Sequence, residues 1–318
     1  MFLVGFMSFR EMKGKFTMAT VLECNGIIKR FGKTTALNGV DLTLDENKIY
    51  GLIGRNGAGK TTLLGILAGQ NFADEGSVSS YGLPVWENSE AMEKICFSRE
   101  LSTSTAFGPD TRKVKEIFRI ARIFYPNWDE EYAKRLLVEF KLDIKKPINK
   151  LSKGMLSMVS IIIALASRAP ITFLDEPVAG LDVMMREKFY QLLLDDYMEN
   201  PRTYIISTHI IDEASNVFEE VVLVDAGKIM LKQNTEELRA QYAYVSGRED
   251  TVNEAIKGLE VVHREGLGKS LTVCVKLNGN EQFEQYDVDV SPVNLQKIFV
   301  YLTEQYESVA NAATPALA

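Results

Sequence analysis

The apolar and polar positions of the first hundred residues form short stretches that are typical of strands. VLECNGIIKRF, residues 21–31, has the character of a strand, and an apolar helix is predicted over about residues 60–67. Further short strands are predicted at 41–44, 48–54, 77–82 and 94–98. We expect antiparallel pairing among the first strands of this series.

From about residue 111 the pattern becomes helical. The helical stretch 111–140 is broken by YPNWD, where Pro126 ends one helix and Asp129 can cap the next. Downstream, strands and helices alternate, which predicts an α/β core with a largely parallel sheet. The predicted elements are a helix after 151–154, a strand at 171–176, a helix over 183–199, a strand at 202–208, a short helix from Ile210 and strands near 220–231.

After about Tyr242 the pattern changes again, and it predicts a small α+β domain with a tail over residues 243–318. Ser291 is the expected cap of its amphipathic helix, with Pro292 at the first helical position. The expected elements are strands at 270–277 and 286–290 and a helix over 291–306.

The chain therefore divides into three expected parts. The main domain covers residues 18–242 and includes a helical insert at about 104–166. Residues 1–17 show no clear periodicity, and we expect Met18 to be the natural start of the protein. The intact mass of the protein from its native host tests this expectation, because a mass that includes residues 1–17 contradicts it.

Composition excludes some functions. The chain has 318 residues, of which 46% are hydrophobic and 25% charged, as in an ordinary globular protein with a sizeable core. Its net charge of −7 and its lack of a basic block argue against a non-specific nucleic-acid binder. The apolar run at 155–167 is shorter than the ~18 residues that a membrane helix needs. Three widely spaced cysteines fit a reducing, cytoplasmic compartment.

The stretch GRNGAGKT, residues 54–61, lies between an apolar strand and an apolar helix. It matches G-x-x-x-x-G-K-[ST], the phosphate-binding loop, in the context that this motif requires. Its glycines let backbone N–H groups surround phosphate oxygens at a helix N-terminus. Lys60 is expected to reach the β- and γ-phosphates, and the Thr61 hydroxyl to ligate Mg²⁺. The expected nucleotide-binding residues here are Gly54, Arg55, Asn56, Gly57, Ala58, Gly59, Lys60, Thr61 and Thr62.

A phosphate-binding loop alone does not separate a kinase from a GTPase or an ATPase. The strand ITFLDE, residues 171–176, adds two carboxylates at a strand end. Asp175 is placed to hold Mg²⁺, and Glu176 to polarise the attacking water as general base. Together with the loop, these acids predict a P-loop NTPase.

Three further motifs narrow the choice of protein family. LSKGM, residues 151–155, stands before a helix; AGLDV, residues 179–183, follows the two acids; and STH, residues 207–209, follows a strand. In this order, and with the loop and the acids, they resemble the motifs of the ATP-binding subunits of ABC transporters. The resemblance covers about residues 20–240 and implies the fold of an ABC-type ATPase core.

The signature motif of that family has the form L-S-G-G-Q. Leu151, Ser152 and Gly154 match this form, whereas Lys153 and Met155 depart from it. The resemblance implies that Ser152, Gly154 and the helix behind them contact the γ-phosphate of an ATP held by the opposite subunit. Lys153 either adds charge toward that phosphate or points to solvent.

The resemblance assigns roles to three more matching residues. Asp182 is expected to bridge the two subunits. His209 is expected to contact the γ-phosphate and to sense its loss. Phe31, in IKRFGKTTAL, resembles the aromatic residue that stacks on adenine, since an aromatic face suits a flat base.

A further position departs from the family pattern. Where the family usually has a glutamine that touches Mg²⁺ and links the site to the membrane subunit, Glu100 stands here by register, with Ser98 or Arg99 as a shifted alternative. A carboxylate at this position is expected to ligate Mg²⁺ or to raise the pKa of a neighbouring group.

The resemblance implies an ATPase that pairs two subunits around ATP and Mg²⁺, as a homodimer or with another ABC ATPase. The chain looks most similar to exporter ATPases of Gram-positive bacteria, which are linked to peptides, antibiotics and lipid-active compounds and often lie in operons with a GntR-type repressor. A separate membrane permease would hold it at the inner face of the cell membrane. The stretch 120–128 either contacts that permease or forms the core of the insert.

Other classes fit less well. A small-molecule kinase would not need LSKG followed by STH. Ribosome-acting members of the ABC class carry two ATPase units, and DNA-repair members carry a long coiled coil; this sequence shows one unit and no heptads. The appended domain, residues 243–318, could be a regulatory or a dimerising module.

Overall fold

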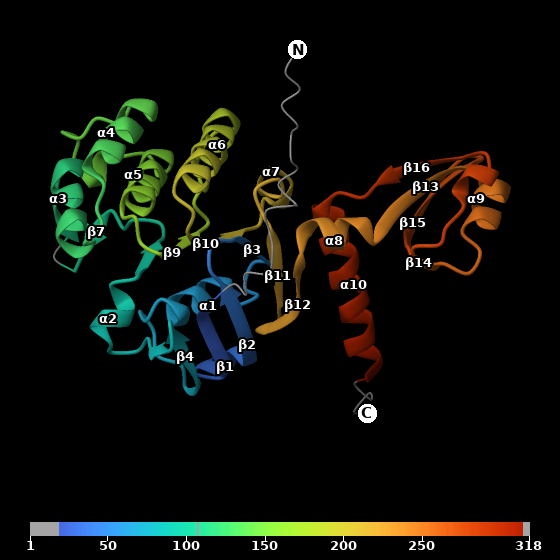
Figure 1. Ribbon diagram of the computed structural model, residues 1–318, viewed down its shortest axis with the longest axis horizontal. Coiled ribbons are helices and arrows are strands. Elements are labelled where there is room, and N and C mark those ends of the chain that lie inside the picture. The colour runs from blue at the N-terminus through green and yellow to red at the C-terminus, as the bar shows by residue number, and fades with distance from the viewer. Residues whose placement is uncertain (1–18, 107, 314–318) are drawn as a thin grey trace, which may run out of the picture.

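The computed structural model describes residues 19–106 and 108–313, so the expectations about residues 1–17 and Met18 lie outside the described residues. Two sheets and a layer of helices form the larger part of the molecule, and a smaller sheet stands to one side (Figure 1). In the part of the chain that the structure describes, no helix has both the length and the apolar character for crossing a membrane.

An antiparallel sheet contains the first strands, as expected, in the order β2-β1-β4-β5. The predicted strand at 41–44 is only the end of β2, which begins at Thr34. The first residues of β2 are exposed and pair with the end of β1 through the backbone. Because their side chains are not buried, the sequence shows no apolar run there from which the strand could be predicted. The strands are β1 (Thr20–Phe31), β2 (Thr34–Asp45), β4 (Glu75–Ser80) and β5 (Leu83–Pro84).

The central sheet has the order β12-β11-β3-β10-β9-β6 and is parallel except at β12. This confirms the largely parallel α/β core. All residues of β3, β9 and β10 are buried, because other layers cover both faces of the sheet. The strands are β3 (Ile49–Ile53), β6 (Ile95–Ser98), β9 (Ile171–Asp175), β10 (Thr203–Thr208), β11 (Glu220–Asp225) and β12 (Lys228–Asn234).

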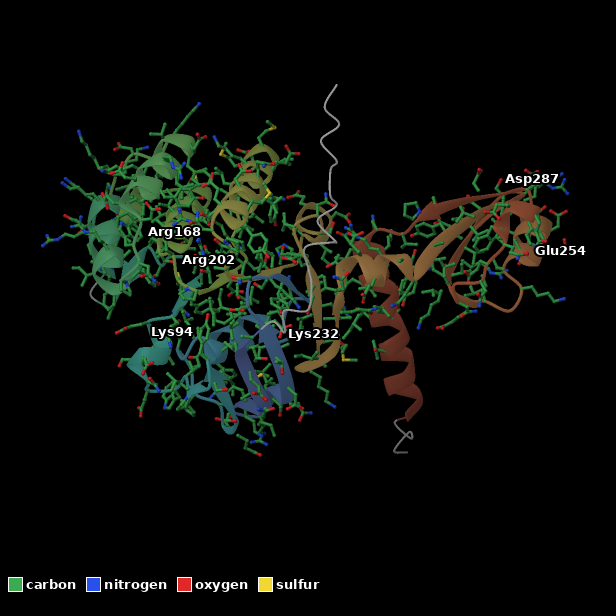
Figure 2. All side chains as sticks on the ribbon, in the orientation of Figure 1. Lys94, Arg168, Arg202, Lys232, Glu254 and Asp287 are labelled. Carbon is green, nitrogen blue, oxygen red and sulfur yellow. The ribbon has the colours of Figure 1, made fainter. Side chains whose placement is uncertain are left out.

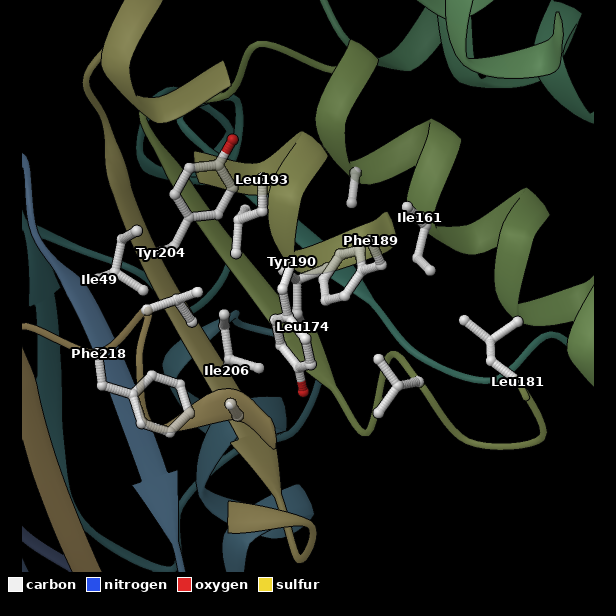
Figure 3. Close-up of a cluster of buried hydrophobic side chains, with 14 of the residues drawn as sticks. Ile49, Ile161, Leu174, Leu181, Phe189, Tyr190, Leu193, Tyr204, Ile206 and Phe218 are labelled. Carbon is white, nitrogen blue, oxygen red and sulfur yellow. The ribbon is translucent and has the colours of Figure 1, made fainter. Parts of the chain in front are cut away.

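Alternate residues of the central strands enter two different cores. On β3, Ile49 and Ile53 pack with the helical layer, and Tyr50 and Leu52 pack with the antiparallel sheet. Figure 3 shows the first of these cores, which we call the main core. In it, side chains of the sheet meet those of the helices α5 (Lys153–Ala166) and α6 (Val183–Glu199). The strand ends that carry functional residues are therefore held from both sides.

Helices cover one face of the central sheet and form the insert (Figure 1). Asp129 caps α4, as predicted, because its Oδ1 accepts a bond from Tyr132 N at 2.9 Å. The elements are α1 (Lys60–Leu67), α2 (Ser89–Met92), β7 (Ser104–Thr105), β8 (Gly108–Pro109), α3 (Val114–Phe124), α4 (Glu130–Glu139), η1 (Ile148–Lys150), α5 (Lys153–Ala166), α6 (Val183–Glu199) and α7 (Ile211–Ala214).

A buried acid joins the helices to the sheet. Asp196, on α6 and 2% exposed, accepts bonds from Arg202 Nη2 at 2.6 Å and Tyr204 Oη at 2.7 Å, and it pairs with Arg168. Arg168 and Arg202 lie close together where the helices meet the sheet (Figure 2). A buried carboxylate without such partners would be strongly destabilising. The network therefore fixes α6 against β10.

The last part of the chain forms an antiparallel sheet in the order β14-β15-β13-β16. It has a small core of its own, built around Val245, Val252 and Val273. The elements are α8 (Thr235–Ala240), β13 (Tyr242–Arg248), α9 (Glu249–Ala255), β14 (Glu260–Leu267), β15 (Ser270–Lys276), η2 (Phe283–Gln285), β16 (Val288–Pro292) and α10 (Leu295–Ala313).

The predicted cap of the last helix was wrong. Ser291 and Pro292 end β16, where they pair with β13, and α10 begins at Leu295. Asn294 is the cap, since its Oδ1 accepts a bond from Lys297 N at 2.9 Å. Pro292 lies at the end of an edge strand, where a missing N–H costs little.

Candidate active site

The phosphate-loop sequence forms a tight loop between β3 and α1. Gly57 and Gly59 have φ angles of 82° and 105°, in the left-handed region that favours glycine. A Cβ on Gly59 would lie 2.7 Å from the carbonyl oxygen of Ala36, and a Cβ on Gly54 would lie 2.3 Å from that of Val224. No side chain caps α1, so its first N–H groups can donate to an anion.

Lys60 lies inside this loop. Its Nζ donates to the carbonyl oxygens of Gly54 at 2.7 Å and Arg55 at 3.2 Å. Burial lowers the pKa of Lys60, while the nearby carboxylates of Glu176 and Asp175 act in the opposite direction. A buried ammonium held mainly by neutral carbonyls provides a strong site for phosphate oxygens. The glycine loop, the uncapped helix and Lys60 together fit a nucleotide.

The other loop residues lie around this centre. Ala58 is buried, and its carbonyl accepts a bond from Gly227 N at 3.0 Å. Arg55 and Asn56 are exposed and line a cavity of about 900 Å³ on the outer flank of the loop, together with Tyr306 of α10. Thr62 is half-buried in the first turn of α1.

The two acids stand at the end of β9, beside the end of the neighbouring parallel strand β10. Asp175 ends β9, and its Oδ1 accepts a bond from Ser207 Oγ of β10 at 2.5 Å. The backbone N–H of Glu176 also donates to Ser207, with N···Oγ at 3.1 Å. Glu176 has a φ of 50°, a conformation in which a non-glycine residue is strained. Ser207 thus holds both acids, a role that the STH motif did not reveal.

Glu176 lies between two basic side chains. Its Oε1 is 4.0 Å from Lys60 Nζ, and its Oε2 is 2.7 Å from Nδ1 of His209. The Glu176 side chain is 25% exposed and the His209 side chain 49% exposed, so both groups can reach a bound molecule. This geometry suits a general base whose orientation is fixed by a histidine.

A cavity of about 900 Å³ lies beside these residues. Its lining includes Thr61, Asp175, Glu176 and Glu100. Within the described residues, no group of three His, Cys, Asp or Glu side chains could hold a metal ion by itself. The arrangement fits Mg²⁺, which usually binds one or two carboxylates and completes its shell with phosphates and water. Thr61, Asp175 and Glu100 are the side chains that would hold it.

The LSKG and AGLD segments pack against each other. A Cβ on Gly154 would lie 2.6 Å from the carbonyl oxygen of Gly180, and Ser157 Oγ donates to Ala179 O at 2.6 Å. Ser152 caps α5 through Met155 N at 3.3 Å. In the same way, Asp182 caps α6 by accepting a bond from Met185 N, with N···Oδ1 at 3.0 Å.

Two positions that depart from the family pattern are close in space. Lys153 Nζ lies 3.6 Å from Glu100 Oε2. Neither alternative for Lys153, phosphate or solvent, anticipated this pair. Ser98, the shifted alternative to Glu100, donates its hydroxyl to Ser160 O at 3.0 Å.

Phe31 ends β1 and is 56% exposed. Lys29 Nζ lies 5.5 Å from the centre of its ring. An exposed aromatic face next to a cation can stack on a flat, electron-rich base. The structure therefore leaves Phe31 available for the expected contact with adenine.

Comparison with known proteins agrees with this geometry. The family model described as "ABC transporter" matches residues 37–179. The ABC transporter ATP-binding protein YtrB of Bacillus subtilis (strain 168) is 25% identical over 287 residues, which are 88% of this chain and 97% of that protein. The probable sulfate/thiosulfate import ATP-binding protein CysA of Chlorella vulgaris is 30% identical over 221 residues, 67% of this chain and 90% of that protein.

Two further matches complete this comparison. The bacitracin transport ATP-binding protein BcrA of Enterococcus faecalis is 27% identical over 222 residues, 70% of this chain and 71% of that protein. A solved structure of an ATP-binding subunit of an ABC transporter superposes with a TM-score of 0.60 at 24% identity. It covers 70% of this chain and 93% of its own chain, and so it shows the same fold.

Proposed function

The chain belongs to the family of ATP-binding subunits of ABC transporters and is an ATPase, and from this premise we propose that it powers a membrane exporter by ATP-dependent closure of two subunits. The observation that carries the proposal is the position of the Glu176 carboxylate between Lys60 and His209, at the edge of the cavity that Thr61 and Asp175 line. These residues belong to one catalytic arrangement.

Hydrolysis follows from this arrangement. Glu176 accepts a proton from a water molecule as the water oxygen attacks the γ-phosphorus, and the bond from phosphorus to the ADP oxygen breaks. Lys60 and the N–H groups of α1 stabilise the charge on the phosphate oxygens. His209 holds the carboxylate of Glu176 in place through its Nδ1. Mg²⁺, when bound by Thr61 and the neighbouring acids, supplies further charge neutralisation.

Two subunits complete the site. Among the described residues that line the cavity beside Thr61, α5 contributes Leu156, Ser160 and Ile163 but neither Ser152 nor Gly154. The signature residues are therefore available to another molecule. We place them against the ATP of an opposite subunit, with Asp182 at the interface. ATP drives closure only if it binds the closed pair more tightly than the open one.

The permease is proposed to contact helix α3. Ile120, Ile123 and Phe124 are 36%, 73% and 72% exposed, which is unusual for side chains of this size. Tyr125 and Trp128, one and four residues beyond Phe124, pack against the main core instead. The stretch 120–128 thus divides into an exposed half suited to a partner and a half that belongs to the insert.

We propose export, from the cytoplasmic face of the membrane, of a peptide, an antibiotic or a lipid-active compound. Support comes from the LSKGM signature and from the similarity to BcrA, a bacitracin transport ATP-binding protein, which covers 70% of this chain. Nucleic acid is not an expected partner of this acidic chain.

The first experiment is size-exclusion chromatography of Glu176→Gln with ATP and Mg²⁺. Loss of the base should trap bound ATP, and we expect a shift from monomer to dimer that depends on ATP. Glu254→Gln, in the appended part, is the matched control and should stay monomeric. A Glu176→Gln variant that binds ATP and stays monomeric would contradict closure of two identical subunits. One that binds no ATP would contradict the nucleotide site itself.

A further inference from the structure

Two of the departures from the family's motifs, Lys153 and Glu100, contact each other. Lys153 is the first residue of α5, and Glu100 stands two residues beyond the end of β6. Their Nζ and Oε2 atoms are 3.6 Å apart, and their side chains are 57% and 58% exposed. A cation at a helix N-terminus is electrostatically unfavourable, and a carboxylate there is favourable. Glu100 therefore compensates the charge that Lys153 adds to this helix end.

The stem of Lys153 also touches the AGLD segment. A Cβ on Gly180 would lie 2.7 Å from Lys153 Cγ, so the lysine chain lies directly over this glycine. Gly180 has a φ of 80°, which a side chain would strain as well. The Lys153 side chain thus connects the signature segment, the AGLD segment and Glu100. A movement of its ammonium group changes its contacts with all three.

Two hydrogen bonds from serine side chains to backbone carbonyls keep Glu100 within reach of α5. Ser98 Oγ donates to Ser160 O, and Ser160 Oγ donates to Arg99 O, both at 3.0 Å. These bonds fix the segment before Glu100 independently of the ion pair. An exposed ion pair contributes little stability, because water and salt screen it. The contact between Glu100 and Lys153 can therefore break while the segment stays in place.

We propose that Glu100 holds Lys153 in the nucleotide-free subunit and that the γ-phosphate of the opposite subunit's ATP replaces it during closure. This exchange rests on the proposed function, because only a second subunit brings a phosphate to this end of α5. A phosphate carries more negative charge than a carboxylate and offers more acceptor oxygens. Glu100 acts as an internal competitor for Lys153 and sets how much ATP is needed for closure.

The exchange couples the two ATP sites of the dimer. Glu100 lines the same cavity as Thr61 and Asp175, which serve the ATP of its own subunit. When the opposite ATP takes Lys153, the Glu100 carboxylate is released beside the site where Mg²⁺ would bind. ATP at one site thereby favours metal binding at the other, and this coupling is reciprocal.

The test measures the ATP concentration at the midpoint of dimerisation, by size-exclusion chromatography of Glu176→Gln protein with saturating Mg²⁺. Glu100→Gln and Lys153→Met are added singly and together. We expect Glu100→Gln to lower the midpoint roughly two- to fivefold while Lys153 is present, as expected for an exposed pair. In the Lys153→Met background the same substitution should have no such effect. Lys153→Met alone should raise the midpoint.

The control is Lys150→Met, which removes a nearby exposed lysine and should leave the midpoint unchanged. If Lys150→Met and Lys153→Met raise the midpoint equally, general positive charge explains the effect and the exchange is wrong. If Glu100→Gln changes the midpoint by the same factor with and without Lys153, Glu100 acts only through the metal, and the exchange is again wrong.

The experiment distinguishes a failure of the proposed function from a failure of the exchange alone. The parent Glu176→Gln protein is measured first, and the variants of Glu100 and Lys153 follow only if it dimerises. A parent that binds ATP without pairing contradicts closure of two copies and removes the exchange with it. A parent that pairs, with no difference in the effect of Glu100→Gln between the two backgrounds, contradicts the exchange alone.

Discussion

The part of the chain up to Asn234 and the part after Tyr242 differ in what fixes their residues. In the first part, chemistry demands certain residue types at certain positions, such as Gly59 against Ala36 and Lys60 inside its loop. In the second part, the side chains pack in a small sheet and no catalytic group is assigned. Positions that chemistry fixes can be recognised from a short motif, whereas positions that only packing fixes cannot.

The boundary between these two parts of the sequence is not a boundary between hydrophobic cores. Ile298 and Tyr301 of α10 are buried in the main core cluster, together with Ile211 and Ala214 of α7. Helix α7 begins two residues after His209. The last helix is thus appended in sequence but packs with the ATPase part. One face of the sheet before it joins the same core through Tyr242 and Cys274, and the other face has a small core of its own.

The largest expected effect concerns catalysis in the first part. Glu176→Gln should lower the ATPase kcat by about 10²–10⁴-fold, the usual contribution of a general base. Steady-state phosphate release measures this loss, and thermal unfolding should be nearly unchanged. Glu254→Gln in the appended part should retain full activity. Comparable losses in the two variants would contradict the division between a catalytic and a non-catalytic part.

The second effect is on stability and distinguishes the main core from the small core of the last sheet. Ile298→Ala should lower the free energy of unfolding of the ATPase part by about 2–5 kcal/mol, because it leaves a cavity in the main core. Both tryptophans, Trp86 and Trp128, lie in the first part, so urea unfolding followed by their fluorescence reports on that part. Val273→Ala, in the small core, should leave this transition in place. Equal shifts would mean that the two cores unfold together.

Sequence alone predicted which strand ends carry the residues of the candidate site, but not the contacts that support them. The loop, Asp175, Glu176 and His209 stand in short motifs next to apolar strands, so their positions could be predicted. The bond from Ser207 to Asp175 spans 32 residues and depends on which parallel strands are neighbours. Strands that are buried on both faces show no alternation from which that order could be derived.

The appended part shows the same limit. Its strand β13 and helix α9 were not predicted, and Ser291 was wrongly taken as a helix cap. Ser-Pro before an amphipathic run resembles a helix start, but pairing with β13 extends the strand through Pro292. The helix then begins after Asn294, an equally good cap. The tertiary context selected between two local signals of similar strength.

The third effect tests nucleotide binding. Lys60→Met should weaken ATP binding about 10- to 100-fold, as expected when a charged hydrogen-bond donor to phosphate is lost. Equilibrium binding of a fluorescent ATP analogue measures it. Lys257→Met removes an exposed lysine in the appended part and should leave the affinity unchanged. Unchanged binding in Lys60→Met would show that the nucleotide does not occupy the loop.

The smallest effect reports on local opening. Cys24, Cys96 and Cys274 are free and buried, and burial raises the pKa of Cys24 to about 12 and that of Cys274 to about 11. The native thiols are therefore neutral at pH 8, and alkylation requires the chain to open first. Cys274 lies on β15, on the face of the small sheet that joins the main core with Ile298 and Tyr301 of α10. Its labelling by iodoacetamide therefore reports on opening between this sheet and α10, and we expect it to be about tenfold faster than that of the other two cysteines.

The pH dependence of this labelling has a definite sign. Because the folded pKa of Cys274 is raised, the folded state retains a proton that the open state loses above pH 9. The stability contributed by the neutral thiol is present below that pH and is lost as pH rises toward 11. Labelling of Cys274 should therefore accelerate with pH beyond the rise in thiolate alone, as mass spectrometry of each cysteine can show. Equal rates at all three cysteines would mean that the small sheet opens only with the whole molecule.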